Sequence, residues 1–352
     1  MASIVKRDYS LTGDDSRRAV ERGLSQAQWY RTDVSRKRMK ELMHRRNGPA
    51  IRDTLLWVGL LALFSGLGVY LWFSVWSLLC FAVYGVLYGS ASDARWHECG
   101  HGTAFKTRWM NTVVYYLACF MIMRDPTVWR WSHVRHHTDT IIVGRDPEIV
   151  ATRPPPLARI AADFLGLYAV PMAFKHMFIH ASGRLTPDEA TYIPDTERTK
   201  TYWTARVWLV IYAVVVASCL ASGSILPAMV VGLPRMYGAW HHIVTGLTQH
   251  SGLADDVTDH RLNSRTVYMN PLSRFVYWNM NYHVEHHMFP MVPFHALPAL
   301  HAEIKDDLPQ PAPSIAAAFG EFMPVLLRQR RQPEFYIHRQ LPDRANSVGS
   351  AS

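Results

Sequence analysis

Between Arg52 and Arg95 the chain carries no lysine or arginine, and most of the residues between them are apolar. Thr54 to Phe73 is an uncharged run of 20 residues. As an α-helix it would be about 30 Å long and would cross the hydrocarbon core of a bilayer. Ser74 to Ser92 is a second run, separated from the first only by a tight turn. We therefore predict a transmembrane helical hairpin whose two ends share one side of a membrane.

The same pattern recurs at Trp203 to Ser222 and at Ser224 to about Thr245, on either side of Gly223. Of the 37 Lys and Arg residues, 13 precede the first hairpin, 13 lie from Arg95 to Lys200 and 9 follow the second hairpin, which leaves two. Positive charge collects on the cytoplasmic side of membrane proteins. We therefore expect a multi-pass protein of the cell (inner) membrane, with both termini in the cytoplasm.

The predicted fold class is an all-α membrane protein, with two transmembrane helical hairpins (four spans) and a cytoplasmic helical cap. The expected parts are a basic cytoplasmic segment at 1–53, a main domain at 54–310 and a Pro/Ala-rich and polar tail at 311–352. Within the main domain the spans are expected at about 54–73, 74–92, 203–222 and 224–245, and the cap at 93–202 and 246–310. The apolar stretches Thr112–Met123 and Ala161–His180 are expected to lie in the membrane interface. Gln340 to Ser352 is expected to be disordered.

Composition narrows the class of partner. Hydrophobic residues make up 49% of the chain and the net charge is +9. Apolar spans make a membrane surface a better partner than nucleic acid for such a basic chain. The run from Arg36 to Lys40 fits either an anchor on anionic lipid or an ordinary solvated helix. The four cysteines form no CxxC pair, which indicates a reducing compartment without disulfides.

Eight histidines fall into three clusters with the spacing of one helix face. They are His97 and His101; His133, His136 and His137; and His283, His286 and His287. Positions i, i+3 and i+4 share a face, so the three rings of one cluster can reach one point. A single pair would more often be part of a polar helix face, but three clusters favour a metal site. Eight imidazoles exceed what one tetrahedral zinc needs and suit two metals of higher coordination.

Other residues are candidates for supporting roles. Carboxylates can offset the metal charge and accept the second ring N–H, and those placed for this are Glu98, Asp139, Asp146 and Glu285, unless they are plain surface acids. His241 and His242 could be ligands, supporting residues or polar lining. The remaining histidines, among them His44, His176, His260 and His338, are expected at the surface. An electron-poor pair of irons could bind O2 and oxidise a C–H bond, whereas zinc would indicate hydrolysis.

The cluster sequences resemble the membrane fatty acid desaturase family of histidine-box di-iron enzymes over roughly residues 54 to 310. The matching segments are HECGHGT (97–103), HVRHHTDT (133–140), GRDPEI (144–149), QHSG (249–252) and NYHVEHHMFPMVP (281–293). The resemblance implies nine iron ligands: His97, His101, His133, His136, His137, His250, His283, His286 and His287. It also implies two Fe2+ ions, O2 as co-substrate and conversion of CH2–CH2 into CH=CH. Gly246 departs from the pattern, because some acyl-CoA desaturases have Asn there.

Substrate and electron donor are less constrained. The segment 279–293 resembles a bacterial branch that includes dihydrorhizobitoxine desaturase, so both a fatty acyl lipid and a small carboxylate are candidate substrates. Arg235 falls near mid-span, where it should face protein or a cavity. It could meet a substrate carboxylate or be a structural residue beside Pro234. The chain shows no haem, iron–sulfur or GxGxxG motif, so a ferredoxin-type or other electron-transfer protein must supply electrons.

Two alternative functions remain at this point. A hydroxylase or ketolase could use the same iron site, and the histidine clusters do not separate these outcomes from desaturation. A metal-binding transporter would want ionisable residues along the spans, where only Arg206, Arg235 and the pair His241-His242 qualify. No catalytic residue is predicted beyond the metal ligands.

Overall fold

The computed structural model describes residues 7–342, and this part of the chain is helical, with two isolated β-bridges and no strand. The all-α prediction is therefore confirmed for the described residues. Most of the stretch expected to be disordered, Gln340 to Ser352, lies outside them. The N-terminal elements are α1 (Asp14–Glu21), the 3-10 helix η1 (Leu24–Gln26) and α2 (Arg36–Leu42).

The first predicted hairpin is present. It is formed by α3 (Asn47–Tyr70) and α4 (Val75–Gly85), and the chain continues through the π-helix η2 (Val86–Ser90) into α5 (Ala91–Gly100). Three helical stretches are long and apolar enough to cross a membrane: Arg36–Tyr70, Val75–Gly100 and Asp195–Ser222. The helix that begins at α4 thus runs on past the apolar stretch and carries the first histidine pair.

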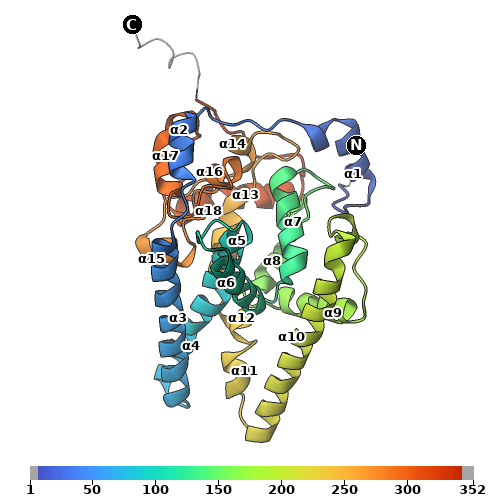
Figure 1. The fold of residues 1–352 in the computed structure, drawn as a ribbon. Helices are drawn as coiled ribbons and strands as arrows, with labels where there is room; N and C mark the ends of the chain where they lie inside the picture. Colours follow the sequence, from blue (N-terminus) through green and yellow to red (C-terminus); the bar gives the residue numbers. More distant parts are fainter. Residues whose placement is uncertain (1–6, 343–352) are drawn as a thin grey trace.

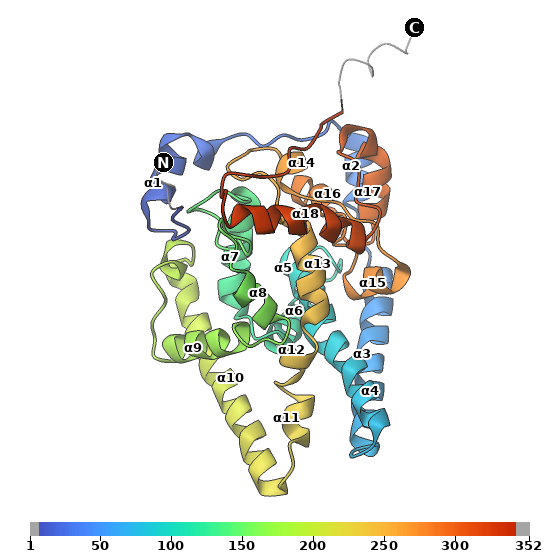
Figure 2. The ribbon, with the colours of Figure 1, turned by 180° about the vertical axis from the view of Figure 1, so that it is seen from behind.

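The second hairpin differs from the prediction. Its first arm, α10 (Asp195–Ser222), ends at Gly223, whose φ of 58° suits glycine. The return arm was expected as one span at 224–245, but it is broken into α11 (Leu226–Val230), α12 (Pro234–Tyr237) and α13 (Trp240–His250). Pro234 lacks an amide hydrogen, and Gly232 has a φ of 97°, so a continuous helix cannot pass here. Figures 1 and 2 show both hairpins extending the same way from the body of the molecule.

The segment between the hairpins contains α6 (Arg108–Met121), α7 (Pro126–Thr138), α8 (Leu157–Asp163), α9 (Ala169–Ala181) and the 3-10 helix η3 (Glu189–Thr191). Asp125 begins α7 by accepting hydrogen bonds from the amides of Thr127 and Val128, with Pro126 in the first turn. α9 lies across the direction of α10 (Figures 1 and 2). Neither of the two stretches expected in the interface, 112–123 and 161–180, is among the three long apolar helices.

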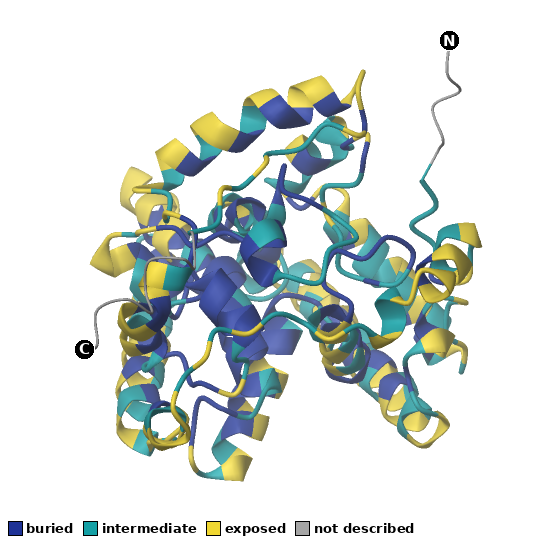
Figure 3. Ribbon diagram, turned by 90° about the horizontal axis from the view of Figure 1, so that it is seen from above, coloured by how far each residue is buried: buried dark blue, intermediate teal, exposed yellow. Residues whose placement is uncertain are grey.

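The C-terminal part contains α14 (His260–Asn263), α15 (Pro271–Val276), α16 (His283–Met288), α17 (Leu297–Ile304), the 3-10 helix η4 (Lys305–Asp307) and α18 (Ile315–Gln329). Sequence analysis predicted no helix at α18. Ser314 caps it, and Phe322 and Leu326 pack against Leu247 of α13 and Ile160 of α8. In the view from above, buried residues gather in the helices at the centre (Figure 3).

The broken arm packs backbone to backbone against the π-helix region. A Cβ added at Gly238 would lie 1.8 Å from the carbonyl oxygen of Gly85, so only glycine allows this approach. Ser90 Oγ donates to the carbonyl oxygen of Gly238 at 2.7 Å and accepts from the amide of His242 at 3.0 Å. The break therefore fixes the start of α13, which carries His242 and His250.

A buried cation fixes the base of α5. The guanidinium of Arg95 is fully buried and lies over the rings of Trp57, Phe275 and Trp278, 4.8–5.2 Å from their centroids. It also donates to the carbonyl oxygens of Ala91 and Val276. Arg95 therefore holds α5, and the histidines on it, against α3 and the segment around α15.

Candidate metal centre

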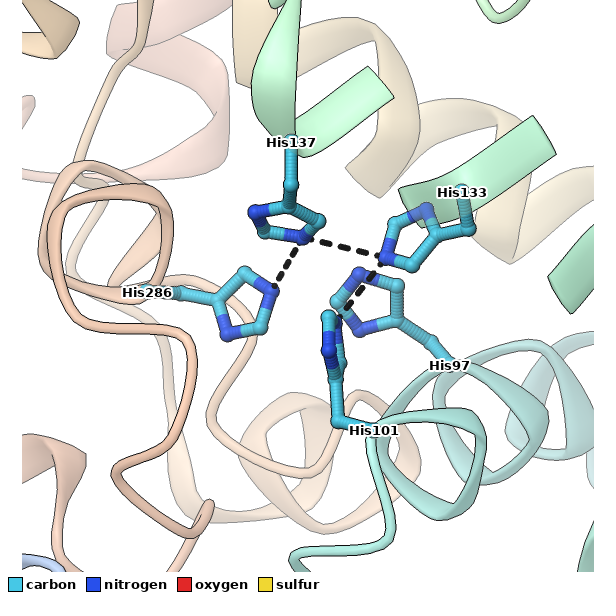
Figure 4. A group of neighbouring side chains, drawn as sticks. All are labelled: His97, His101, His133, His137 and His286. Carbon is cyan, nitrogen blue, oxygen red and sulfur yellow. Dashed lines mark hydrogen bonds between the residues drawn. The ribbon is translucent and has the colours of Figure 1, made fainter. Parts of the chain in front are cut away.

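Nine histidine rings converge in two adjacent groups. We call them the five-ring group (His97, His101, His133, His137 and His286) and the four-ring group (His136, His250, His283 and His287). In each group one nitrogen per ring lies within 4.8 Å of the others. Figure 4 shows the five-ring group, with its rings pointing toward a common centre from three parts of the chain. These are the nine histidines that sequence analysis selected.

The distribution of the rings differs from the prediction. Sequence analysis expected the three rings of one cluster to reach one point, but each triplet divides between the groups. On α7, His133 and His137 belong to the five-ring group and His136 to the four-ring group. On α16 the division is reversed, with only His286 in the five-ring group. Positions i and i+4 lie closer in direction than i+3 does, so each triplet connects the two groups.

The spacing of the ring nitrogens matches ligands around one ion. His133 Nε2 lies 3.1 Å from the Nε2 atoms of both His101 and His137. In the four-ring group His283 Nε2 lies 3.0 Å from the Nε2 atoms of His250 and His287. A metal–nitrogen bond of about 2.1 Å places neighbouring ligands about 3.0 Å apart in an octahedron and about 3.4 Å apart in a tetrahedron. The spacing favours the higher coordination.

Hydrogen bonds at Nδ1 fix the tautomer and the orientation of several rings, whose Nε2 atoms point into the groups. His250 Nδ1 lies 2.8 Å from the carbonyl oxygen of Asn263, which can only accept, so this nitrogen carries the hydrogen. His136 Nδ1 donates in the same way to Asp146 at 2.8 Å, and His133 Nδ1 donates to Glu148 at 3.0 Å. With Nδ1 as the donor, the Nε2 atoms of His133 and His250 carry lone pairs that face other ring nitrogens. A cation between them resolves the repulsion, so the residues fit a metal.

Burial favours the neutral form of the rings, although at His136 the carboxylate of Asp146 outweighs burial and raises the pKa. Burial lowers the pKa of His101 to about 4 and the pKa of His250 to about 3. It also lowers the pKa of His283 and His287 well below the ordinary value. Neutral imidazole is the form that binds a metal, so the site is ready to bind one at pH 7.

Only one of the four predicted supporting carboxylates contacts one of the nine rings. Asp146 does so, through His136. Glu98 instead accepts from Thr103 Oγ1 and the amide of Phe294. The other two also bond elsewhere: Asp139 pairs with Arg145 and Arg135, and Glu285 accepts from Thr266 and His301. These three carboxylates are buried and bond to other backbone and side-chain groups, and their support of the rings stays a prediction.

Sequence reasoning missed Glu148 as a partner of the rings. It lies two residues after Asp146 in the segment GRDPEI, and it also accepts from Ser132 Oγ at 2.5 Å. Burial raises the pKa of Glu148, and the nearby imidazole of His136 opposes that shift. The signal in the sequence was the acidic pair at i and i+2, which places two carboxylates on one bend beside α7.

Two histidines expected at the surface make contacts in the interior, and one of them is buried. His260 is buried, and its ring lies 5.1 Å from the ring of His287, centroid to centroid. His176 is partly exposed and, together with His180, hydrogen-bonds to the buried carboxylate of Glu189 at 3.2 and 3.0 Å. These three side chains form a separate group, joined to one another rather than to the nine rings. One nitrogen of each of the two histidine rings already faces a carboxylate oxygen of Glu189.

A cavity of about 570 Å³ lies beside both ring groups. Its lining includes His97 and His133 of the five-ring group and His136, His250 and His283 of the four-ring group. Arg235 and His242 also line it, whereas His241 does not. Arg235 is buried, its Nε donates to the carbonyl oxygen of Ile122 at 3.1 Å, and its Nη1 has no partner among the described residues. The cavity thus offers an unpaired cationic donor beside the rings.

Comparison with known proteins adds a family assignment. The family model for fatty acid desaturase matches residues 70–318. The chain is similar to "Probable fatty acid desaturase DES1" of Sorghum bicolor, with 25% identity over 57% of this chain and 56% of the relative. It is 24% identical to an endoplasmic reticulum omega-3 fatty acid desaturase of Nicotiana tabacum, over 57% and 58% of the two chains. An omega-6 fatty acid desaturase of Glycine max is 33% identical over 24% of this chain and 22% of its own length. The chain thus matches little more than half the length of the first two relatives and about a fifth of the third.

Proposed function

Since the chain belongs to the fatty acid desaturase family, we propose that it is an O2-dependent membrane desaturase whose nine clustered histidines hold two iron ions. The observation that carries the proposal is the division of the nine rings into two groups with nitrogens about 3 Å apart. Two irons bound there would supply the O2-dependent oxidation that removes two hydrogens from a CH2–CH2 unit. An external donor, a ferredoxin-type or other electron-transfer protein, supplies two electrons, and O2 leaves as two waters.

The side chains around the rings would orient the ligands and exclude water. Asp146 and Glu148 hold His136 and His133 through their Nδ1 atoms, so the Nε2 atoms stay directed at the centre. Met280 and Trp208 give the adjoining cavity apolar walls. A substrate in the cavity would lie against rings of both groups, with its reacting carbons away from bulk solvent.

The substrate is a fatty acyl lipid or a small carboxylate such as dihydrorhizobitoxine. Arg235 distinguishes these two classes. A carboxylate in the cavity could pair with the unpartnered Nη1 of Arg235 and accept from His242, whose Nδ1 also lacks a partner among the described residues. An acyl chain would make no such contact. We infer that Arg235 and His242 form the polar end of the substrate site.

The proposed membrane arrangement has four crossing segments in the cell (inner) membrane, the fourth being the broken arm α11–α13. It is supported by the parallel direction of the two hairpins (Figure 1) and by the concentration of Lys and Arg outside them. Gly223, between α10 and α11, would then face the outside, and residues 93–202 and 246–310 would form the cytoplasmic cap. The main domain would extend over 54–310, between the basic segment 1–53 and the tail 311–352.

The proposal is tested by iron content and turnover of the purified chain. We expect about two irons per chain, because nine imidazoles leave open positions on two six-coordinate ions. Turnover of acyl lipids or small carboxylates should consume O2 and yield an alkene. A hydroxylated or keto product would instead identify the alternative reaction on the same site.

The variant His286→Ala should lower iron content and abolish turnover, because it removes a ring from the five-ring group. The control is His180→Ala, which removes a buried histidine outside both groups. The control should keep its iron. Full iron and full turnover in the His286 variant would refute the ligand assignment.

A further inference from the structure

We propose that electrons enter the centre at Trp29 and pass through His260 to His287, a route that rests on the proposed function. Trp29 is partly exposed, and its ring stacks on His260 with 4.3 Å between centroids and 8° between planes. The ring of His260 lies 5.1 Å from that of His287, at 33°. Two aromatic contacts therefore connect the surface of the molecule to the four-ring group.

The first residue of this route is held firmly against the centre. Trp29 Nε1 donates to the carbonyl oxygen of Thr138, the last residue of α7, at 3.0 Å. The next amide, that of Tyr30, donates to the carbonyl oxygen of Thr258 at 2.9 Å. The amide of Thr32 lies 3.2 Å from the sulfur of Met288, which follows His287. The segment 29–32 is thus attached to both helices that carry a histidine triplet.

His260 is placed by an element that also holds a ring of the centre. It begins α14, and the last residue of that helix, Asn263, accepts from His250 Nδ1 through its carbonyl oxygen. The side-chain amide of Asn263 donates to the carbonyl oxygen of Thr140, just beyond α7. Fixed spacing between His260 and the four-ring group follows from these bonds, and a fixed spacing is what efficient electron transfer needs.

A basic groove begins two residues after Trp29, at Arg31. The segment between α1 and α2 crosses the end of the molecule opposite those tips, over α14 (Figures 1 and 2). The groove is also lined by Arg36, Lys40, Arg45 and Lys106, with one carboxylate, that of Asp33. Five cations against one carboxylate make this groove complementary to an acidic partner.

We therefore assign the groove to an acidic, soluble one-electron carrier of the ferredoxin type, which would dock by charge complementarity. Two such carriers deliver one electron each. The two electrons, two protons and the two hydrogens of the substrate together reduce one O2 to two waters. Trp29 and His260 are unchanged at the end of the cycle, and neither binds substrate.

The test measures anaerobic reduction of the iron-loaded protein by two reductants. One is a reduced plant-type ferredoxin, which is acidic and must dock, and the other is dithionite, which diffuses. Trp29→Leu should slow reduction by ferredoxin several-fold per bound iron and leave the dithionite rate unchanged. Trp29→Phe, which keeps a ring, should recover part of the rate. The matched control is Trp109→Leu, at a tryptophan that is 62% exposed on α6.

The docking face is tested separately by Arg36→Glu and Lys40→Glu. Each should weaken ferredoxin binding to the iron-free chain and lower the second-order reduction rate by about tenfold at low ionic strength, with a flatter salt dependence. Equal ferredoxin rates in wild type and Trp29→Leu, at equal iron, would overturn the route. So would a Trp29→Leu variant in which only the dithionite rate changes, since Trp29 would then be a shield. If neither ferredoxin nor dithionite reduces the iron bound to the wild-type protein, the proposed function is refuted instead.

Discussion

The carboxylate of Glu148 lies 3.0 Å from Nδ1 of His133, the ring whose Nε2 meets two other ring nitrogens of the five-ring group. This bond fixes the tautomer and the plane of the ring that occupies the middle of that group. A carboxylate in this position raises the basicity of the metal-binding nitrogen as well as orienting it.

Glu148→Gln should therefore lower iron affinity by about 10- to 100-fold, the usual effect of losing such a partner. Competition with a chelator, followed by iron analysis, measures the change. Asp139→Asn is the control, because that carboxylate bonds to Arg145 rather than to a ring of the centre. Equal iron affinity in Glu148→Gln and wild type would show that His133 needs no carboxylate.

Arg235→Leu distinguishes the two substrate classes. If a small carboxylate pairs with the unpartnered Nη1, its loss should cost about 2 kcal/mol or more of binding free energy, roughly a 30-fold weaker affinity, with iron retained. Arg206→Leu is the control, since Arg206 is exposed and bonds to the carbonyl oxygen of Ala181. If the variant loses thermal stability but keeps its affinity for the small carboxylate, the result favours the acyl-lipid substrate.

Gly223 should be accessible from outside the cell, and the C-terminus should be cytoplasmic. The reason is the excess of Lys and Arg beyond both hairpins, together with the common direction in which the hairpins extend. A tag inserted at Gly223 is labelled in intact cells, and a cytoplasmic-type reporter is fused after Ser352. Protection of the tag with exposure of the C-terminus would reverse the proposed orientation.

Glu189 should contribute stability that depends on pH. Burial acts to raise its pKa, but hydrogen bonds from His176 and His180 outweigh burial and hold the pKa well below its ordinary value of 4.5. Below about pH 4.5 the unfolded chain therefore binds a proton that the native carboxylate does not. The free energy of unfolding then decreases as the pH is lowered. Glu189→Gln should destabilise the protein by about 1–3 kcal/mol at pH 7.

The difference between wild type and Glu189→Gln should shrink as the pH falls below about 4.5, which thermal unfolding in detergent measures. Glu197→Gln is the control, because Glu197 pairs with Lys200 at the surface. A stability difference between wild type and Glu189→Gln that stays constant from neutral to acid pH would show that the charge of Glu189 contributes nothing to stability.

The sequence predicted the helical class, the first hairpin and eight of the nine converging rings from local periodicity and hydropathy, and the ninth, His250, from the family resemblance. A kink at Pro234 was expected, but not the division of the arm into three helices, which depends on the close contact of Gly238 with Gly85, more than 150 residues earlier. Nor did the sequence predict α18, whose apolar face was hidden by a composition rich in Ala and by Pro324 within the helix.

The burial of His260 had no signal in the sequence either. No second histidine stands beside it at helical spacing, and its cover comes from Trp29, far away in the chain. The same holds for the carboxylates: spacing identifies which acids are near a cluster, but only the folded backbone decides that Glu148 faces a ring and Glu98 faces Thr103.

The nine rings join helices that are up to 190 positions apart, from His97 on α5 to His287 on α16. Metal loading would therefore act as the final crosslink of the cap, since affinity for the native form alone adds directly to its stability. A cell short of iron would hold a looser chain with its cap open to proteases. Iron supply would then set the amount of this protein as well as its activity, through degradation of the unloaded form.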